Sequence, residues 1–342
     1  MKIPFTKKRF SIFLLLFLLS CLTSCSDSTR QKGGDQGQSQ PKHIVYRLKW
    51  LFNASVVGDI WAKEKGVFEL AGLTVEVKEG GPEQDAIKDL ELGRAHFGVA
   101  SADQVIRAAA KGAPVLVVAQ LFQKNPLQWI YRCDQVHINS PQDLKKYRIG
   151  VTFGGNDEAI LLALLSKYHL DPQNLDLYAV HYDFNPFWKG LVNLWPVYRN
   201  TQGILLSHKM AKIGEKACFF DPTRYGIKFV ANSVVTSQAI YDQHPELVVR
   251  FVKALLKAWA DALSEENLEN AVALLKRYAP ETPKPILEEQ IRATRTLVLP
   301  DGVAMPGMID MAAWRQTEQI MVDQQLIDKP VKIERLLKPP LL

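Results

Sequence analysis

The chain has 342 residues, 47% hydrophobic and 23% charged, with a formal net charge of +6. Four basic and no acidic residues fall within the first 24 positions, which leaves 38 basic against 36 acidic residues, or +2, in the remainder. This near balance gives no reason to expect a nucleic-acid partner.

Residues 1–24 resemble a lipoprotein signal peptide. Lys2, Lys7, Lys8 and Arg9 precede an apolar run at 11–19, which is too short to span a bilayer and is typical of a secretory signal. The sequence Leu-Thr-Ser-Cys that ends at Cys25 matches a bacterial lipobox, whose cysteine thiol receives a diacylglycerol. We therefore expect lipidation at Cys25, with a plain secretory signal as the alternative.

Residues 25–42 are expected to form a flexible tether, because Ser26 to Lys42 offer no apolar side chain to bury. A lipid and a tether together would hold a folded domain beside a membrane. No later segment is long and apolar enough for a transmembrane helix. The expected location is the cell envelope, lipid-anchored at the periplasmic or extracytoplasmic face of a bacterial membrane.

Two cysteines, Cys133 and Cys218, remain beyond this leader. They could pair in an oxidising compartment, although two isolated cysteines are more often simply buried. The sequence leaves their pairing open.

The remaining chain, about 300 residues, is large for one core and natural for two lobes. Its first part alternates between strand and helix patterns, which predicts a largely parallel sheet with helices on both faces. We expect strands at 43–48, 73–77, 97–100, 115–119 and 128–132, and helices at 56–65, 83–92 and 102–111.

A second unit begins near Cys133, and the last third of the chain is helical. In the second unit we expect strands at 148–153, 175–180 and 203–206, and helices at 157–168 and 187–194, after which residues 227–230 return towards the first lobe. After His244-Pro245-Glu246 the apolar residues recur at three- and four-residue spacing, which predicts an amphipathic helix. Further helices are expected at 271–278 and 311–323.

Several short motifs, in order between residues 44 and 265, resemble one known family. They include Trp50-Leu51-Phe52-Asn53, the stretches 97–103 and 111–114, Trp195-Pro196-Val197-Tyr198 and His244-Pro245-Glu246. The chain is similar to periplasmic binding proteins for thiamine pyrimidine precursors, whose wider relatives bind sulfonates, taurine, nitrate and riboflavin.

The resemblance implies an α/β, two-lobed type II periplasmic-binding-protein fold, with a mostly parallel sheet in each lobe and a cleft between the lobes. Lobe 1 would comprise 43–133 plus 234–342, and lobe 2 would comprise 134–233. Two chain crossings would form a hinge that closes on a ligand. The implied partners are a small-molecule ligand and the permease and ATPase of an ABC importer. We expect a monomer, with no nucleic acid, cofactor, metal or catalytic residue.

Ligands of open α/β sheets lie beyond the carboxyl ends of the strands. A flat heteroaromatic ligand, pyrimidine-like or flavin-like, would stack on aromatic side chains there. The candidate contacts are Trp50, Asn53, Ser101, Phe122, Gly154, Gly155, Asn156, Trp188, Trp195, Tyr198 and Tyr225. The amides at Gly154 and Gly155, before a helix, would favour a carboxylate, a phosphate or a polar ring atom.

Structural roles stay open for several of these residues. Ser101 is suited to cap the following helix, Asn53 to a turn or cap, and Trp188 to helix packing. The segment also departs from the family pattern, because Asn193, Arg199 and Asn200 stand where acidic residues are common. A carboxylate would pair well with an aminopyrimidine, so the exact ligand stays open.

Two other functions are alternatives to solute binding for transport. One is a small-molecule sensor or receptor lipoprotein without transport. The other is an enzyme like the family's pyrimidine synthase, which consumes its own histidine and carries a cysteine-rich iron site. The seven histidines here are scattered and no cysteine cluster occurs, which disfavours the enzyme.

Overall fold

The larger sheet has five strands in the order β2-β1-β3-β10-β4. The computed structural model describes residues 43–81, 84–181 and 183–340, so the expected signal peptide, Cys25 and the tether lie outside the described residues. The strands are β1 (Ile44–Arg47), β2 (Val75–Lys78), β3 (Phe97–Ala100), β4 (Val115–Gln120) and β10 (Ser233–Ser237). Because β1 runs parallel to β2 and β3, and β10 antiparallel to β3 and β4, the carboxyl ends of β1 to β4 share one edge.

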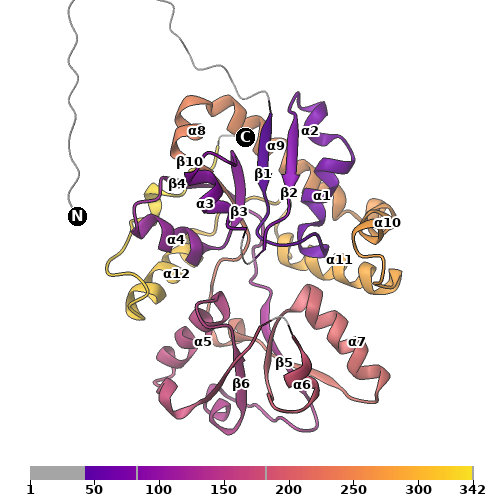
Figure 1. Cartoon of the computed structure of the whole chain (residues 1–342), viewed down its shortest axis with the longest axis vertical. Helices are drawn as coiled ribbons and strands as arrows, with labels where there is room; N and C mark the ends of the chain where they lie inside the picture. The colour runs from indigo at the N-terminus through magenta and orange to yellow at the C-terminus, as the bar shows by residue number, and fades with distance from the viewer. Residues whose placement is uncertain (1–42, 82–83, 182, 341–342) are drawn as a thin grey trace, which may run out of the picture. The chain divides into compact units, whose positions relative to one another are not determined.

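Helices cover both faces of this sheet, α1, α2 and α9 on one flank and α3, α4 and α12 on the other (Figure 1). The first set is α1 (Val57–Glu64), α2 (Val67–Leu70) and α9 (Pro245–Ala262), and α10 (Leu268–Tyr278) and α11 (Lys284–Val298) add residues to the same core cluster. The second set is α3 (Ala86–Glu91), α4 (Ala102–Ala110) and α12 (Met311–Asp323), and α8 (Gln238–Gln243) follows β10.

The amphipathic pattern after His244 is the long helix α9, as expected. Phe251 on its apolar face stacks on Phe97 with ring centroids 3.8 Å apart. Further along, a Cβ on Gly58 would lie 2.1 Å from the Trp259 ring, so only glycine allows α1 to pack this closely on α9.

The smaller lobe holds a three-stranded sheet, β8-β5-β9, and a two-stranded sheet, β6-β7. Its strands are β5 (Leu127–Arg132), β6 (Arg148–Val151), β7 (Asp176–Ala179), β8 (Trp195–Tyr198) and β9 (Ala217–Phe220). Its helices are α5 (Asn156–Lys167), α6 (Asn185–Trp188) and α7 (Ile204–Lys212). Only β6 and β7 form a parallel pair among these five strands, since β5 runs antiparallel to both β8 and β9.

Some expected elements differ. The apolar run at 203–206, expected as a strand, leads into α7, in which Ile204, Leu206 and Met210 are buried. Short apolar runs do not distinguish a strand from a buried helix turn. The helix expected at 187–194 is the short α6, which ends at Trp188. The structure also pairs Cys133 with Cys218, at the ends of adjacent strands β5 and β9.

Two connecting segments cross between the lobes, one between β4 and β5 and the other between β9 and β10. They are bonded to each other: the Asn125 side-chain amide donates to the Phe229 carbonyl at 2.8 Å, and the Phe122 amide donates to the Asn232 carbonyl at 3.1 Å. The described residues form one compact unit. Among its described residues, no helix is long and apolar enough to cross a membrane. The bounds expected for the lobes stay a prediction, and sheet membership gives β5 to the smaller lobe.

Candidate functional site

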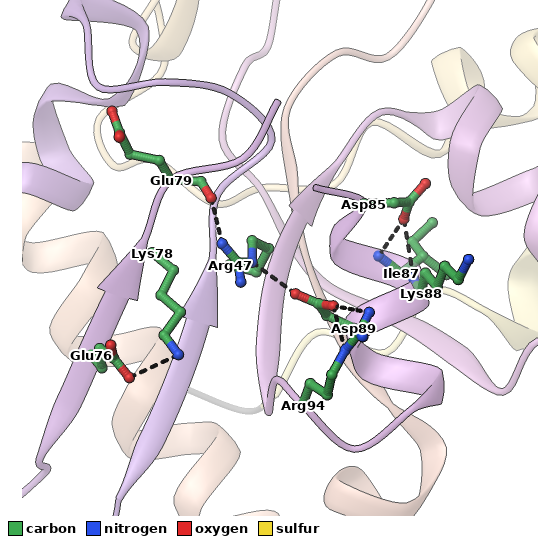
Figure 2. A network of polar contacts seen from close by, with 9 residues as sticks. All are labelled: Arg47, Glu76, Lys78, Glu79, Asp85, Ile87, Lys88, Asp89 and Arg94. Atoms are coloured by element: carbon green, nitrogen blue, oxygen red, sulfur yellow. Dashed lines mark hydrogen bonds and ion pairs between the residues drawn. The ribbon is translucent and has the colours of Figure 1, made fainter. Parts of the chain in front are cut away.

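The turns at the carboxyl edge of the larger sheet are held by a buried charge network, which Figure 2 shows. Arg47, near the end of β1, donates from Nε to Asp89 Oδ2 at 2.8 Å and from Nη1 to the Glu79 carbonyl at 2.6 Å. Arg94 holds the other oxygen of Asp89 at 2.6 Å. One guanidinium thereby fixes α3 and the turn after β2 relative to β1.

The turn after β1 lies directly on the turn after β2. Glu79 Oε1 accepts from the Phe52 amide at 2.6 Å, and the Gly80 amide donates to the Trp50 carbonyl at 3.0 Å. A Cβ on Gly80 would lie 2.0 Å from the Leu48 carbonyl oxygen. Glycine is therefore required for the approach that presents the partly buried Trp50 at this edge.

Three candidate residues in the larger lobe have structural partners. Asn53 accepts from the Ser55 amide at 2.7 Å and donates to the Leu51 carbonyl at 3.0 Å, so it caps a short 3₁₀ turn. Ser101 forms a capping box with Gln104 at the start of α4. Phe122 is 1% exposed and meets Trp259 edge-on. Their roles as ligand contacts stay predictions.

In the smaller lobe, the sheet edge that faces the larger lobe is the one where the chain enters from β4. Tyr198 pairs with Leu127, the first residue of β5, and the bridge between Ile149 and Leu194 aligns β6 with β8. Tyr198 and the Gly154–Asn156 turn after β6 therefore lie at the same edge. Lys49 Nζ, from the larger lobe, donates to the Tyr198 hydroxyl at 3.3 Å.

Beyond Tyr198 the chain forms a π-helical turn, η4 (Arg199–Gly203), that reaches the larger lobe. Asn200, 0% exposed, donates to Ser55 Oγ at 3.0 Å and to Thr294 Oγ1 at 2.8 Å. Gln290 Nε2 donates to the Thr201 carbonyl at 3.2 Å. We call Ser55, Asn200, Thr201, Gln290 and Thr294 the polar seam.

Sequence reasoning missed the polar seam. It singled out Asn200 only as a departure from the family pattern, and α11, which carries Gln290 and Thr294, was not expected as a helix. The Asn200 side-chain oxygen is buried and accepts no hydrogen bond from the described residues. No local pattern distinguishes a serine, an asparagine and a threonine that meet only in the folded chain.

The turn before α5 is already occupied by carboxylates. The Thr152 amide donates to Asp157 Oδ2 at 2.6 Å and the Gly154 amide to Glu158 Oε2 at 2.7 Å. Burial raises the pKa of Asp157 to about 6, although the hydrogen bond from Thr152 lowers it. The Gly154 amide, which we expected to favour an anionic ligand group, is thus bound by the chain's own side chain.

Three other candidates lie away from this edge. Trp195 is 2% exposed and packs on Phe184 in the core of the smaller lobe. Trp188 lies 5.9 Å from the guanidinium of Arg132, the last residue of β5. Tyr225 stacks on Phe220 and meets Tyr168 edge-on. The structure does not bring these rings to Tyr198.

Two hollows of the protein surface lie away from these turns. No three His, Cys, Asp or Glu side chains of the described residues are grouped to hold a metal ion. One hollow of about 410 Å³ lies around Lys145, Arg148 and Asn193 on the smaller lobe, and another of about 630 Å³ lies on the larger lobe.

The comparisons with known proteins agree with this architecture. A family model described as NMT1/THI5 like matches residues 53–267, more than half of the chain. The chain belongs to the NMT1/THI5-like family. The solved structure of the periplasmic aliphatic sulfonate-binding protein SsuA from Escherichia coli has a TM-score of 0.70 and 17% identity, over 88% of this chain and 94% of that one. The two-lobed periplasmic-binding-protein fold is thereby confirmed.

Curated relatives of this NMT1/THI5-like chain include two that are named for small-molecule binding and one named as a synthase. Riboflavin-binding protein RibY of Chloroflexus aurantiacus is 25% identical over 95% of this chain and 93% of its own length. A formylaminopyrimidine-binding protein of Halalkalibacterium halodurans is 23% identical over 96% and 97%. A Legionella pneumophila relative, 24% identical over 76% and 80%, is named 4-amino-5-hydroxymethyl-2-methylpyrimidine phosphate synthase.

Proposed function

We propose that this chain is the extracytoplasmic solute-binding component of an ABC importer and that it captures a heteroaromatic ligand, pyrimidine-like or flavin-like, between its lobes. The observation that carries the proposal is the contact of Lys49 with Tyr198 across the lobes, beside the turn that holds Trp50. An aromatic ring, a phenol and an ammonium group at one edge suit a flat ligand with polar ring atoms.

The turn before α5 favours this ligand class over sulfonates. Asp157 and Glu158 place two carboxylates where a strongly anionic group would otherwise bind backbone amides. Like charges in such a site repel, whereas an uncharged ring with N–H donors gains acceptors. The names of the riboflavin- and formylaminopyrimidine-binding relatives point to the same class.

The location and partners follow as parts of the same proposal. Lipidation at Cys25 would anchor the chain, and a permease and an ATPase would take over the ligand and supply the energy. The bond between Cys133 and Cys218 supports an oxidising, extracytoplasmic compartment. We propose that the chain acts as a monomer.

Ligand binding can be tested with the chain from residue 26 onward. We expect binding of one riboflavin-like or aminopyrimidine-like molecule per chain, seen by tryptophan fluorescence and by a rise in melting temperature, and no response to alkanesulfonates. Mass spectrometry of the natively purified protein would identify a carried ligand. A chain that binds neither riboflavin-like nor aminopyrimidine-like molecules would contradict the proposal.

Paired variants locate the site. Tyr198→Phe removes the hydroxyl that contacts Lys49, and we expect a severalfold loss of affinity without loss of stability. Trp188→Phe tests another candidate in the smaller lobe, and from its place beside Arg132 we expect unchanged affinity. The reverse result would move the site to the Arg132 end of β5.

Two alternatives stay distinguishable from transport. A sensor without transport would bind the same ligand but leave uptake unchanged when the gene is deleted. A pyrimidine synthase would lose a histidine from its own chain during turnover, which the mass of the protein after incubation with ligand would reveal.

A further inference from the structure

The larger lobe carries a basic hollow that the proposed ligand site does not use. The hollow of about 630 Å³ lies between α2, α9 and the start of α10. We call it the basic groove, and its side chains include Trp61, Lys65, Leu70, Arg250, Lys253 and Lys257.

The charges of the basic groove are mostly uncompensated. Arg250, Lys253 and Lys257 follow one another at three- and four-residue spacing, so they lie on the same face of α9. Asp261 is the acidic residue among those that line the groove, and it pairs with Lys257 at 2.6 Å. Among the described residues, no carboxylate lies within ion-pair distance of Lys65, Arg250 or Lys253.

An exposed leucine lies beside these cations. Leu70, at the end of α2, is 88% exposed. Lys65 Nζ lies 4.9 Å from the centre of the Trp61 ring, so the ammonium group makes a cation–π contact with the indole. Cations beside an exposed leucine match the two layers of a membrane surface, the headgroups and the acyl boundary.

The groove lies close to the point where the N-terminal segment joins the lobe. The Ile44 amide donates to the Thr74 carbonyl at 2.8 Å, and Thr74 follows the end of α2 by four residues. A coil of 17 residues, the number from Ser26 to Lys42, has a root-mean-square end-to-end distance of about 20–25 Å. A lipid on Cys25 would therefore keep this end of the larger lobe near the bilayer.

We propose that the basic groove docks the larger lobe on the anionic headgroups of a lipid bilayer. The position of the groove relative to the bilayer rests on the proposed anchoring at Cys25, whereas the attraction between its cations and anionic lipid does not. Docking through this surface would leave the turns around Trp50 and Tyr198 free for ligand.

The test uses the unlipidated chain from residue 26 onward and vesicles of phosphatidylcholine with or without 30% phosphatidylglycerol, an amount chosen as roughly that of an anionic leaflet. We expect sedimentation with the anionic vesicles only. Lys65→Gln with Lys253→Gln should weaken this binding roughly fivefold for each cation removed. Leu70→Ser should weaken it further without any change in charge.

The matched control is Lys209→Gln with Lys212→Gln on the exposed side of α7, which changes the net charge equally. We expect this control to bind anionic vesicles as the parent does. Equal losses in both double variants, or no binding by the parent chain, would overturn the inference. Ligand affinity, measured separately on each variant, tests the proposed function independently.

Discussion

Asp59 is a buried carboxyl in the core of the larger lobe that makes the stability of the fold depend on pH. Its Oδ1 accepts from the Tyr46 hydroxyl at 2.7 Å and from Trp259 Nε1 at 3.2 Å, while Oδ2 is buried and accepts no hydrogen bond from a described side chain. Burial raises the pKa of Asp59 to about 7, although both hydrogen bonds lower it. The folded state thus holds a proton that the unfolded chain releases at lower pH.

The sign of the pH dependence follows from this raised pKa. The stability contributed by protonated Asp59 is complete below the ordinary carboxyl pKa and is lost as the pH rises towards 7. Asp59→Asn keeps the acceptor but removes the titration. Between pH 5 and pH 8 the parent should lose stability that the variant does not lose. We therefore expect the free energy of unfolding of the variant minus that of the parent to rise by about 2–3 kcal/mol over this range.

Urea unfolding at both pH values measures this difference. Asp134→Asn, in an exposed turn, is the control and should show the same offset from the parent at pH 5 and pH 8. An Asp59→Asn offset that is also independent of pH would mean that Asp59 is ionised in the folded protein.

Two elements from different lobes, η4 and α11, share the polar seam. Asn200 Nδ2 joins them by donating to Thr294 Oγ1, and Thr294 Oγ1 in turn donates to the Gln290 carbonyl at 2.8 Å. A buried polar group that loses its hydrogen-bond partner lowers the stability of the fold. Loss of a partner in the seam should therefore destabilise both η4 and α11. The seam therefore links the stability of α11 to the position of the turn that follows Tyr198.

Thr294→Val tests this link with little change in shape. We expect the free energy of unfolding to fall by about 1–2 kcal/mol, because Asn200 loses an acceptor in a buried site. Hydrogen exchange of amides 199–203 should become faster. Thr296→Val, on the exposed side of the same helix, is the matched control and should change neither quantity. Slow exchange at 199–203 in both variants would show that the seam does not hold η4.

At the scale of the whole molecule, the chain passes twice between the lobes and a disulfide closes most of the smaller one. Cys133 and Cys218 are 85 residues apart in sequence and join the ends of β5 and β9. In the loop-entropy account, a closed loop of this length stabilises the fold by about 4–5 kcal/mol through the unfolded chain.

Replacing both cysteines with alanine should therefore lower the denaturant midpoint. The parent should lose stability on addition of reductant, and the double variant should not respond to it. A parent chain whose midpoint is the same with and without reductant would show that the bond does not form or does not contribute.

Local patterns in the sequence predicted the elements that are long or strongly periodic. The helix after His244 and the buried strand at 115–119 were predicted because apolar spacing and a proline at the first helical turn are local properties. The motifs between residues 44 and 265 also predicted the family, since their order along the chain is a sequence property.

Only the tertiary structure decided which of the candidate residues meet. Trp195 and Tyr198 lie in one strand, yet Trp195 is buried in the smaller lobe and Tyr198 contacts Lys49. Asn200 and Thr294 are 94 residues apart and meet through the packing of α11 on η4. A sequence fixes periodicity and turn chemistry over a few residues, whereas contacts across lobes depend on how the sheets are ordered and where the chain crosses, which local pattern does not encode.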